Sequence, residues 1–176
     1  MPETPLTPFI GDRVPRILVV DDNPANLAVL AAHLRRWRCA VTTASTGPEA
    51  LAAARAAPPD LVLLDILMPD VSGLEVCEAL QADPAMARIP VIFVTALTDV
   101  DSKVRAFDAG ARDYITKPFD AAELAARVGT RLRQKYAEDE LQRRTGGAGR
   151  GTPPAPGAGA VGPGTPPVPG PGRSDR

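Results

Sequence analysis

The stretch ILVVDDNP, residues 17–24, joins a short apolar run to a helix start through two acids. Four consecutive apolar residues are typical of a parallel strand that is covered on both faces of its sheet. Asn23 and Pro24 then supply a helix N-cap and the proline that suits a first helical turn. Apolar residues follow at helical spacing over residues 27–37. The stretch therefore predicts a β-strand, an acidic turn and an α-helix in succession.

The same alternation repeats along the chain. Further strands are expected at residues 39–43, 61–64, 90–94 and 114–116. The remaining helices are expected at about residues 47–56, 74–80, 101–109 and from 120 to about 144. Five strands alternating with five helices indicate a doubly wound α/β domain with a parallel sheet. Ligands of such sheets bind beyond the carboxyl ends of the strands, so the polar residues there are the candidates for function.

Composition sets the expected boundaries of this domain. Residues 146–176 contain 10 glycines and 8 prolines among 31 residues. Such a segment holds too little apolar surface to offset the entropy lost on ordering. We therefore expect a disordered N-terminal extension over residues 1–14, one domain over residues 15–144, and a Pro/Gly-rich disordered tail or linker over residues 145–176.

Charge and composition exclude several classes of function. The formal net charge is −1, so no overall field favours binding of nucleic acid or of an anionic membrane, and we expect neither as a partner. The N-terminus resembles no signal peptide and no stretch is long enough to span a bilayer, so we expect a cytoplasmic protein. Cys39 and Cys77 have no metal-like spacing and are predicted to be buried, reduced thiols. His33 is the only histidine, and we interpret it as structural.

Polar residues follow four of the predicted strands. Asp21 and Asp22 end the first, Asp65 the third, Thr95 the fourth and Lys117 the fifth. Each alone has an ordinary explanation as a turn, cap or surface residue. Together they place three acids, a hydroxyl and an ammonium at one edge of the sheet. Three close carboxylates favour a hard divalent cation such as Mg²⁺, which also neutralises phosphoryl oxygens. Because a carboxylate can itself be a nucleophile, the set is suited to forming an aspartyl-phosphate.

These residues resemble the CheY-like receiver family, the response regulators of two-component signalling. The resemblance runs from about Arg16 to Leu141 without an evident gap. It is carried by the segments VDDN (20–23), LDILMP (64–69), VTA (94–96) and YITKPF (114–119), together with Gly73. The family implies a flavodoxin-like sheet of strand order 2-1-3-4-5.

The resemblance also assigns roles at the acidic edge. Asp65 would be the phospho-acceptor. Asp22, Asp65 and the backbone oxygen of Leu67 would hold Mg²⁺, with Asp21 acting mainly through a metal-bound water. The Leu67 side chain cannot assist a hydrolytic water, which leaves the speed of dephosphorylation open.

Three further residues receive roles from the resemblance. Lys117 would bridge to the acceptor and then to the phosphoryl group, and its bond to Pro118 is expected to be cis. Thr95 would move to hydrogen-bond a phosphoryl oxygen, and Tyr114 would turn inward behind it. Tyr114 has a second interpretation, as a strand aromatic that packs on the sheet.

Several functions stay open. The chain could be a stand-alone receiver, a receiver whose output domain lies beyond the tail, or a metal-dependent phosphatase with an Asp nucleophile. The last is disfavoured because Leu67 occupies the position where such enzymes usually carry a second acid. As a receiver it would be no independent enzyme. A sensor histidine kinase or phosphotransfer protein would be its donor, and a downstream protein or a phosphorylation-dependent homodimer its output. We expect residues 134–144 to be a solvated helix rather than a coiled coil.

Overall fold

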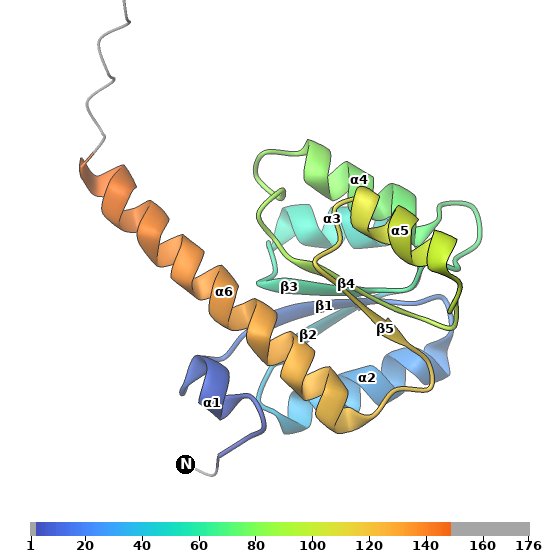
Figure 1. Cartoon of the computed structure of the whole chain (residues 1–176), viewed down its shortest axis with the longest axis horizontal. Helices are drawn as coiled ribbons and strands as arrows, with labels where there is room; N and C mark the ends of the chain where they lie inside the picture. Colours follow the sequence, from blue (N-terminus) through green and yellow to red (C-terminus); the bar gives the residue numbers. More distant parts are fainter. Residues whose placement is uncertain (1–2, 149–176) are drawn as a thin grey trace, which may run out of the picture. The chain divides into compact units, whose positions relative to one another are not determined.

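The computed structural model describes residues 3–148, with side chains described as far as residue 145. Its five strands form one sheet in the order β2-β1-β3-β4-β5, as the family resemblance implied (Figure 1). Every neighbouring pair is parallel. The strands are β1 (Arg16–Val20), β2 (Ala40–Ala44), β3 (Leu61–Leu64), β4 (Val91–Thr95) and β5 (Asp113–Thr116).

Helices cover both faces of the sheet. They are α1 (Thr7–Ile10), α2 (Pro24–Arg36), α3 (Gly47–Ala56), α4 (Gly73–Ala82), α5 (Val100–Asp108) and α6 (Ala121–Ala148). α3, α4 and α5 lie on one face, whereas α1, α2 and the first part of α6 lie on the other (Figure 1). The described part of the chain therefore holds six helices where the sequence predicted five, because α1 was not expected.

The core is divided into two layers by the sheet. Leu18 and Val20 of β1 point into the layer beneath α3, α4 and α5. Ile17 and Val19 point into the layer shared with α1, α2 and α6. Alternate residues of one buried strand thus serve opposite faces, which explains the continuous apolar runs seen in the sequence.

Polar side chains cap the N-termini of α2 and α4, the helices that follow β1 and β3. The Asn23 side chain accepts hydrogen bonds from the backbone N–H groups of Ala25 and Asn26, and Pro24 occupies the first turn, as predicted. Ser72 and Glu75 form a reciprocal capping box at the start of α4. These caps end each strand-to-helix connection at a defined residue and satisfy backbone N–H groups of the first helical turn.

The expectation of disorder over residues 1–14 is wrong for the described residues 3–14. They include α1, and Leu6 is fully buried with Ile10 close to it in the core layer of α2 and α6. Phe9 packs against the same layer. Burial of these apolar side chains supplies the free energy that orders a segment too short to be helical alone.

The expected boundary at residue 145 also differs, since α6 continues to Ala148. Residues 149–176, most of the predicted tail, lie outside the described residues. Within residues 3–148, no helix combines the length and the apolar character that crossing a bilayer requires.

Cys39 and Cys77 are buried free thiols, as the sequence predicted. Burial raises the pKa of each to about 12. At pH 8 this lowers the thiolate fraction about a thousandfold relative to a thiol of ordinary pKa. We expect an aromatic disulfide reagent to modify neither cysteine within minutes in the native protein and both at once in denaturant. Absorbance of the released thiolate measures this, and rapid native modification of either cysteine would contradict it.

Candidate functional site

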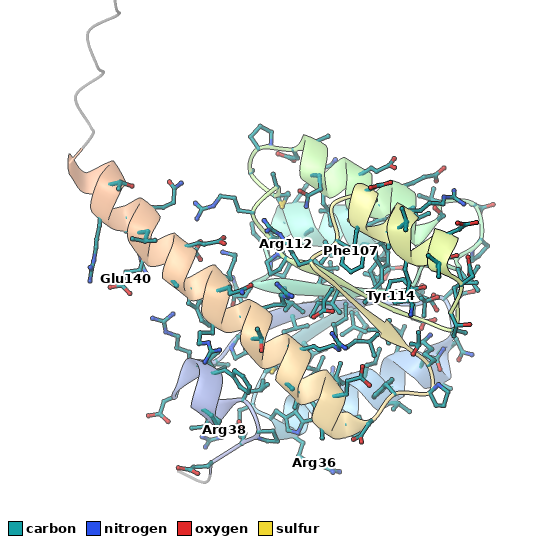
Figure 2. All side chains as sticks on the ribbon, in the orientation of Figure 1. Arg36, Arg38, Phe107, Arg112, Tyr114 and Glu140 are labelled. Atoms are coloured by element: carbon teal, nitrogen blue, oxygen red, sulfur yellow. The ribbon has the colours of Figure 1, made fainter. Side chains whose placement is uncertain are left out.

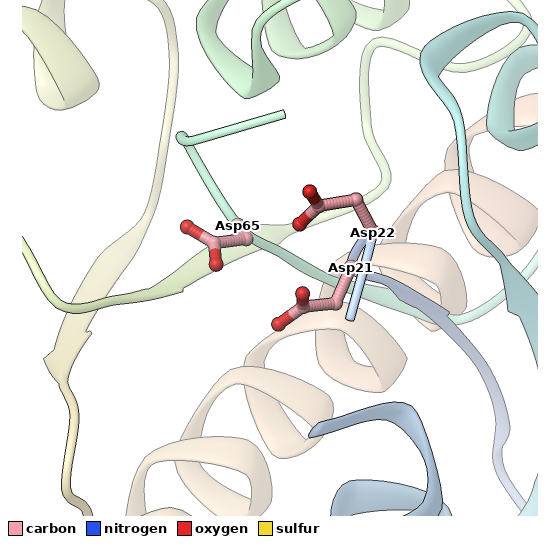
Figure 3. A group of neighbouring side chains, drawn as sticks. All are labelled: Asp21, Asp22 and Asp65. Atoms are coloured by element: carbon pink, nitrogen blue, oxygen red, sulfur yellow. The ribbon is translucent and has the colours of Figure 1, made fainter. Parts of the chain in front are cut away.

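Three carboxylates meet at the carboxyl ends of β1 and β3. Asp21 and Asp22 follow β1, and Asp65 follows β3 (Figure 3). The two strands are neighbours in register, with Val20 opposite Leu64, so the residues that follow them lie side by side. Each acid offers an oxygen within 4.8 Å of the others. Asp21 and Asp65 are 1% and 6% exposed, while Asp22 is open to solvent. The structure thus brings together the three acids singled out in the sequence.

Lys117 links two of these carboxylates. Its Nζ lies 2.8 Å from Oδ2 of Asp65 and 2.6 Å from Oδ2 of Asp21. The contact with Asp65 agrees with the predicted bridge, whereas the contact with Asp21 was not predicted. Burial lowers the pKa of Lys117, but hydrogen bonds and charges from the two aspartates outweigh it and raise the pKa above its ordinary value. Lys117 is therefore charged at neutral pH and partly balances the acids.

Backbone groups orient the two buried carboxylates. The N–H of Leu67 donates to Oδ1 of Asp65 at 3.1 Å. The N–H of Asn23 donates to Oδ1 of Asp21 at 2.9 Å. Each carboxylate thus has one oxygen on a backbone N–H and the other on Lys117. This double anchoring holds the acids in one orientation before any ligand arrives.

The donor set fits a hard divalent cation. Three carboxylates and one ammonium carry a formal charge of −3 + 1 = −2, which one divalent ion balances. Their oxygens are the ligands Mg²⁺ prefers, and solvent at Asp22 leaves room for the waters that Mg²⁺ keeps. No sulfur or imidazole belongs to this cluster, which disfavours zinc.

Thr95 and Tyr114 both contact Leu97 in the connection after β4. Thr95 is fully buried at the end of β4, and its Oγ1 accepts from the N–H of Leu97 at 3.5 Å. The Tyr114 hydroxyl donates to the carbonyl of Leu97 at 2.6 Å. Leu97 could not be singled out from the sequence as part of the site, because its backbone rather than its side chain makes these contacts.

The Tyr114 ring lies buried where β5 approaches α5 (Figure 2). It packs near Phe93 of β4 and beneath Lys103 of α5. Burial, followed by the charges of Asp99 and Asp65, raises the pKa of Tyr114. The ring therefore packs on the sheet, as the second interpretation of this residue expects, and the switch role stays a prediction.

The end of β5 is tied to the end of β4. The N–H of Lys117 donates to the carbonyl of Thr95 at 2.8 Å, and the bond between Lys117 and Pro118 is cis, as predicted. The His33 ring lies near the rings of Trp37 and Phe119, in agreement with a structural role.

Known proteins are similar to this chain in sequence. The family model described as the response regulator receiver domain matches residues 17–129. Response regulator PleD of Caulobacter vibrioides is 44% identical over 129 residues, which cover 73% of this chain and 28% of PleD. The DNA-binding dual master transcriptional regulator RpaA of Synechocystis is 42% identical over 121 residues, covering 69% of this chain and 50% of RpaA. The chain therefore spans half or less of these two curated relatives.

Solved structures resemble it in fold. A CheY-like response regulator receiver domain protein from Methanospirillum hungatei aligns with a TM-score of 0.67 and 30% identity, covering 72% of this chain and 99% of its own. A BeF3-activated DrrB receiver domain aligns with a TM-score of 0.62 and 35% identity, covering 68% of this chain and 98% of its own. Both alignments span nearly the whole of the solved chain, so the similarity extends over a complete domain.

Proposed function

The chain belongs to the response regulator receiver family, and from this premise we propose that it is a phosphorylation switch whose phospho-acceptor is Asp65. One observation carries the proposal. Asp65 shares Lys117 with Asp21 at hydrogen-bond distance, and Asp22 lies in the same cluster at the solvent-exposed edge. The acceptor is thus held in place and neutralised in part, beside the solvent-exposed Asp22.

The reaction moves one phosphoryl group. An Asp65 carboxylate oxygen attacks phosphorus of a phosphohistidine, a P–O bond forms, and the P–N bond breaks. The released imidazole nitrogen takes up a proton. The donor would be a sensor histidine kinase or a phosphotransfer protein, so the chain itself acts as a signalling acceptor and not as an independent enzyme. Lys117 remains beside the acceptor and pairs with the charge that the phosphoryl group adds.

Asp22, Asp65 and the backbone oxygen of Leu67 would hold Mg²⁺ directly, and Asp21 would act through water. When bound, Mg²⁺ would neutralise phosphoryl oxygens and so lower the barrier to transfer between anions. The support is the oxygen-only donor set and its formal charge of −3 + 1 = −2.

Thr95 and Tyr114 would report the phosphorylated state. A phosphoryl group on Asp65 offers new acceptor oxygens, toward which Thr95 would move. Because Thr95 and Tyr114 share Leu97, movement of one changes the packing of the other. Phosphorylation would thereby shift the population between two packings of the face made by α5, β5 and the start of α6.

This face, residues 99–126, would be the output surface. A downstream protein or a second copy of the chain, in a phosphorylation-dependent homodimer, would bind it in the cytoplasm. Val104 and Phe107 of α5 are half exposed there and offer apolar contact area. Whether the chain acts alone or through an output domain, the proposed switch is the same.

Incubation with a small acyl phosphate tests the proposed function. We expect the intact mass to increase by one phosphoryl group in millimolar Mg²⁺ and to stay unchanged when EDTA replaces the metal. Backbone amides of Asp22, Asp65 and Leu67 should shift on Mg²⁺ titration in NMR spectra. A mass gain that is equally fast in EDTA would contradict the metal site, and no gain under any condition would contradict the function.

Hydrogen exchange tests the output surface. With beryllofluoride as a phosphoryl mimic, we expect changed protection over residues 99–126, because the contacts of Leu97 with Thr95 and Tyr114 rearrange. Mass spectrometry of proteolytic fragments with and without the mimic measures this. Changes confined to α3, residues 47–56, would overturn the assignment of the surface.

A further inference from the structure

Gly47 is the first residue of α3, packed beneath the connection that carries the acceptor. It is buried, and its φ lies outside the left-handed region that favours glycine. Glycine is a poor helix former, so neither backbone conformation nor helix propensity explains it. The reason must lie in what surrounds its α-carbon.

A side chain at this position would meet Val71. A Cβ built on Gly47 would lie 2.8 Å from Cγ1 and 2.9 Å from Cβ of Val71, and 3.0 Å from Cγ2 of Val76. Valine is stiff because its Cβ is branched, and that Cβ is bonded directly to the backbone. No rotamer change can relieve the contact with it. A methyl group on Gly47 therefore has to move the backbone of residue 71 or the start of α3.

Val71 belongs to the loop of residues 66–72, which joins Asp65 to α4. Internal hydrogen bonds hold this loop in shape. The N–H of Val71 donates to the carbonyl of Pro69 at 2.8 Å, and the N–H of Gly73 to that of Ile66 at 2.9 Å. At its other end the N–H of Leu67 donates to the Asp65 carboxylate. A displacement at residue 71 is thus transmitted to Leu67 and to the carboxylate that Leu67 orients.

We propose that Gly47 is a positioning residue for the acceptor loop. Its bare α-carbon lets Val71 rest on α3, which sets the loop so that the Asp65 carboxylate and the Leu67 backbone oxygen face a cation together. The inference rests on the proposed function and adds to it a residue of a helix that donates no group to the site. Gly47 acts through Val71 and touches neither metal nor phosphoryl group.

The test is the variant Gly47→Ala, with Gly129→Ala as its matched control. A Cβ on Gly129 would lie 2.3 Å from the Phe9 side chain, on α6 and in the other core layer. Both variants should lower the melting temperature. Only Gly47→Ala should raise the Kd for Mg²⁺, by about five- to tenfold, since small displacements of ligating groups have large effects. It should also shift the Leu67 amide resonance in metal-free protein.

The double variant Gly47→Ala with Val71→Ala identifies the route. Removal of the valine methyl groups makes room for the new methyl. We therefore expect the Kd for Mg²⁺ to return to within about twofold of the wild-type value, and the Leu67 amide resonance to return close to its wild-type position. If Gly47→Ala alone fails to fold, the double variant should fold and bind Mg²⁺.

Three results would overturn the inference. They are an unchanged Kd and Leu67 resonance in Gly47→Ala, an equal loss of affinity in Gly129→Ala, or a double variant that is no better than Gly47→Ala. If wild-type protein binds no Mg²⁺, the proposed metal site fails, but the Leu67 resonance in metal-free variants still decides whether Gly47 positions the loop.

Discussion

Asp65→Asn should abolish the phosphorylation of this chain by a small acyl phosphate. The neutral amide is a poor nucleophile, and it also removes one of the three charges that attract a divalent cation. We expect the rate of phosphoryl gain, followed by intact mass in Mg²⁺, to fall at least about a hundredfold. Asparagine has nearly the shape of aspartate, so the far-UV circular dichroism should stay that of wild type.

Asp70→Asn is the matched control. Asp70 lies in the same loop but is exposed, with a φ of 68° that asparagine also tolerates. Its rate of phosphorylation should stay within about twofold of wild type, as for most exposed substitutions. A phosphoryl gain in Asp65→Asn at the wild-type rate would show that another residue is the acceptor.

The location of the candidate site could be predicted because parallel strands leave little freedom. Continuous apolar runs identify buried strands, and each ends at its first polar residue. Asp21, Asp65, Thr95 and Lys117 therefore had to lie at one edge once the strands were parallel, and the structure brings Lys117 within 2.8 Å of Asp65. The sheet order and the individual roles came from family resemblance and not from these patterns.

The N-terminal helix could not be predicted for a physical reason. Leu6, Phe9 and Ile10 fall among three prolines in ten residues, and a four-residue helix has no periodicity to detect. Its stability comes from tertiary contacts with α2 and α6, including the close approach of Phe9 to Gly129. Only the folded chain brings these partners together.

The side-chain geometry of the site could not be predicted from the sequence either. The residue pattern placed Lys117 opposite the acids but could not show that it lies closer to Asp21 than to Asp65. In the same way, glycines that are needed for space look like ordinary turn or helix-start residues. Gly73 was singled out only as part of a family motif, and its surroundings show why a side chain is excluded.

Gly73→Ala should have the largest effect on stability of any glycine substitution in the site. A Cβ on Gly73 would lie 2.0 Å from the carbonyl oxygen of Asp65, 2.8 Å from its carbonyl carbon and 2.9 Å from Cα of Ile66. All three are backbone atoms, so no side-chain rotation can make room. Separation requires α4 to move away from the end of β3, or the acceptor to move with its carbonyl. Overpacking of this kind reaches about 3 kcal/mol, and we expect a melting temperature roughly 10 °C lower, together with loss of Mg²⁺ binding.

Gly11→Ala separates this close contact from the general effect of replacing a glycine. Gly11 has a φ of 64°, and a Cβ there would meet nothing within 4 Å. Its substitution should cost only about 1 kcal/mol for the left-handed backbone, a decrease of roughly 3 °C, and leave the Kd for Mg²⁺ unchanged. Thermal unfolding followed by circular dichroism compares the two variants. Equal decreases would mean that the carbonyl of Asp65 yields easily, and that the contact with Gly73 does not hold the acceptor in place.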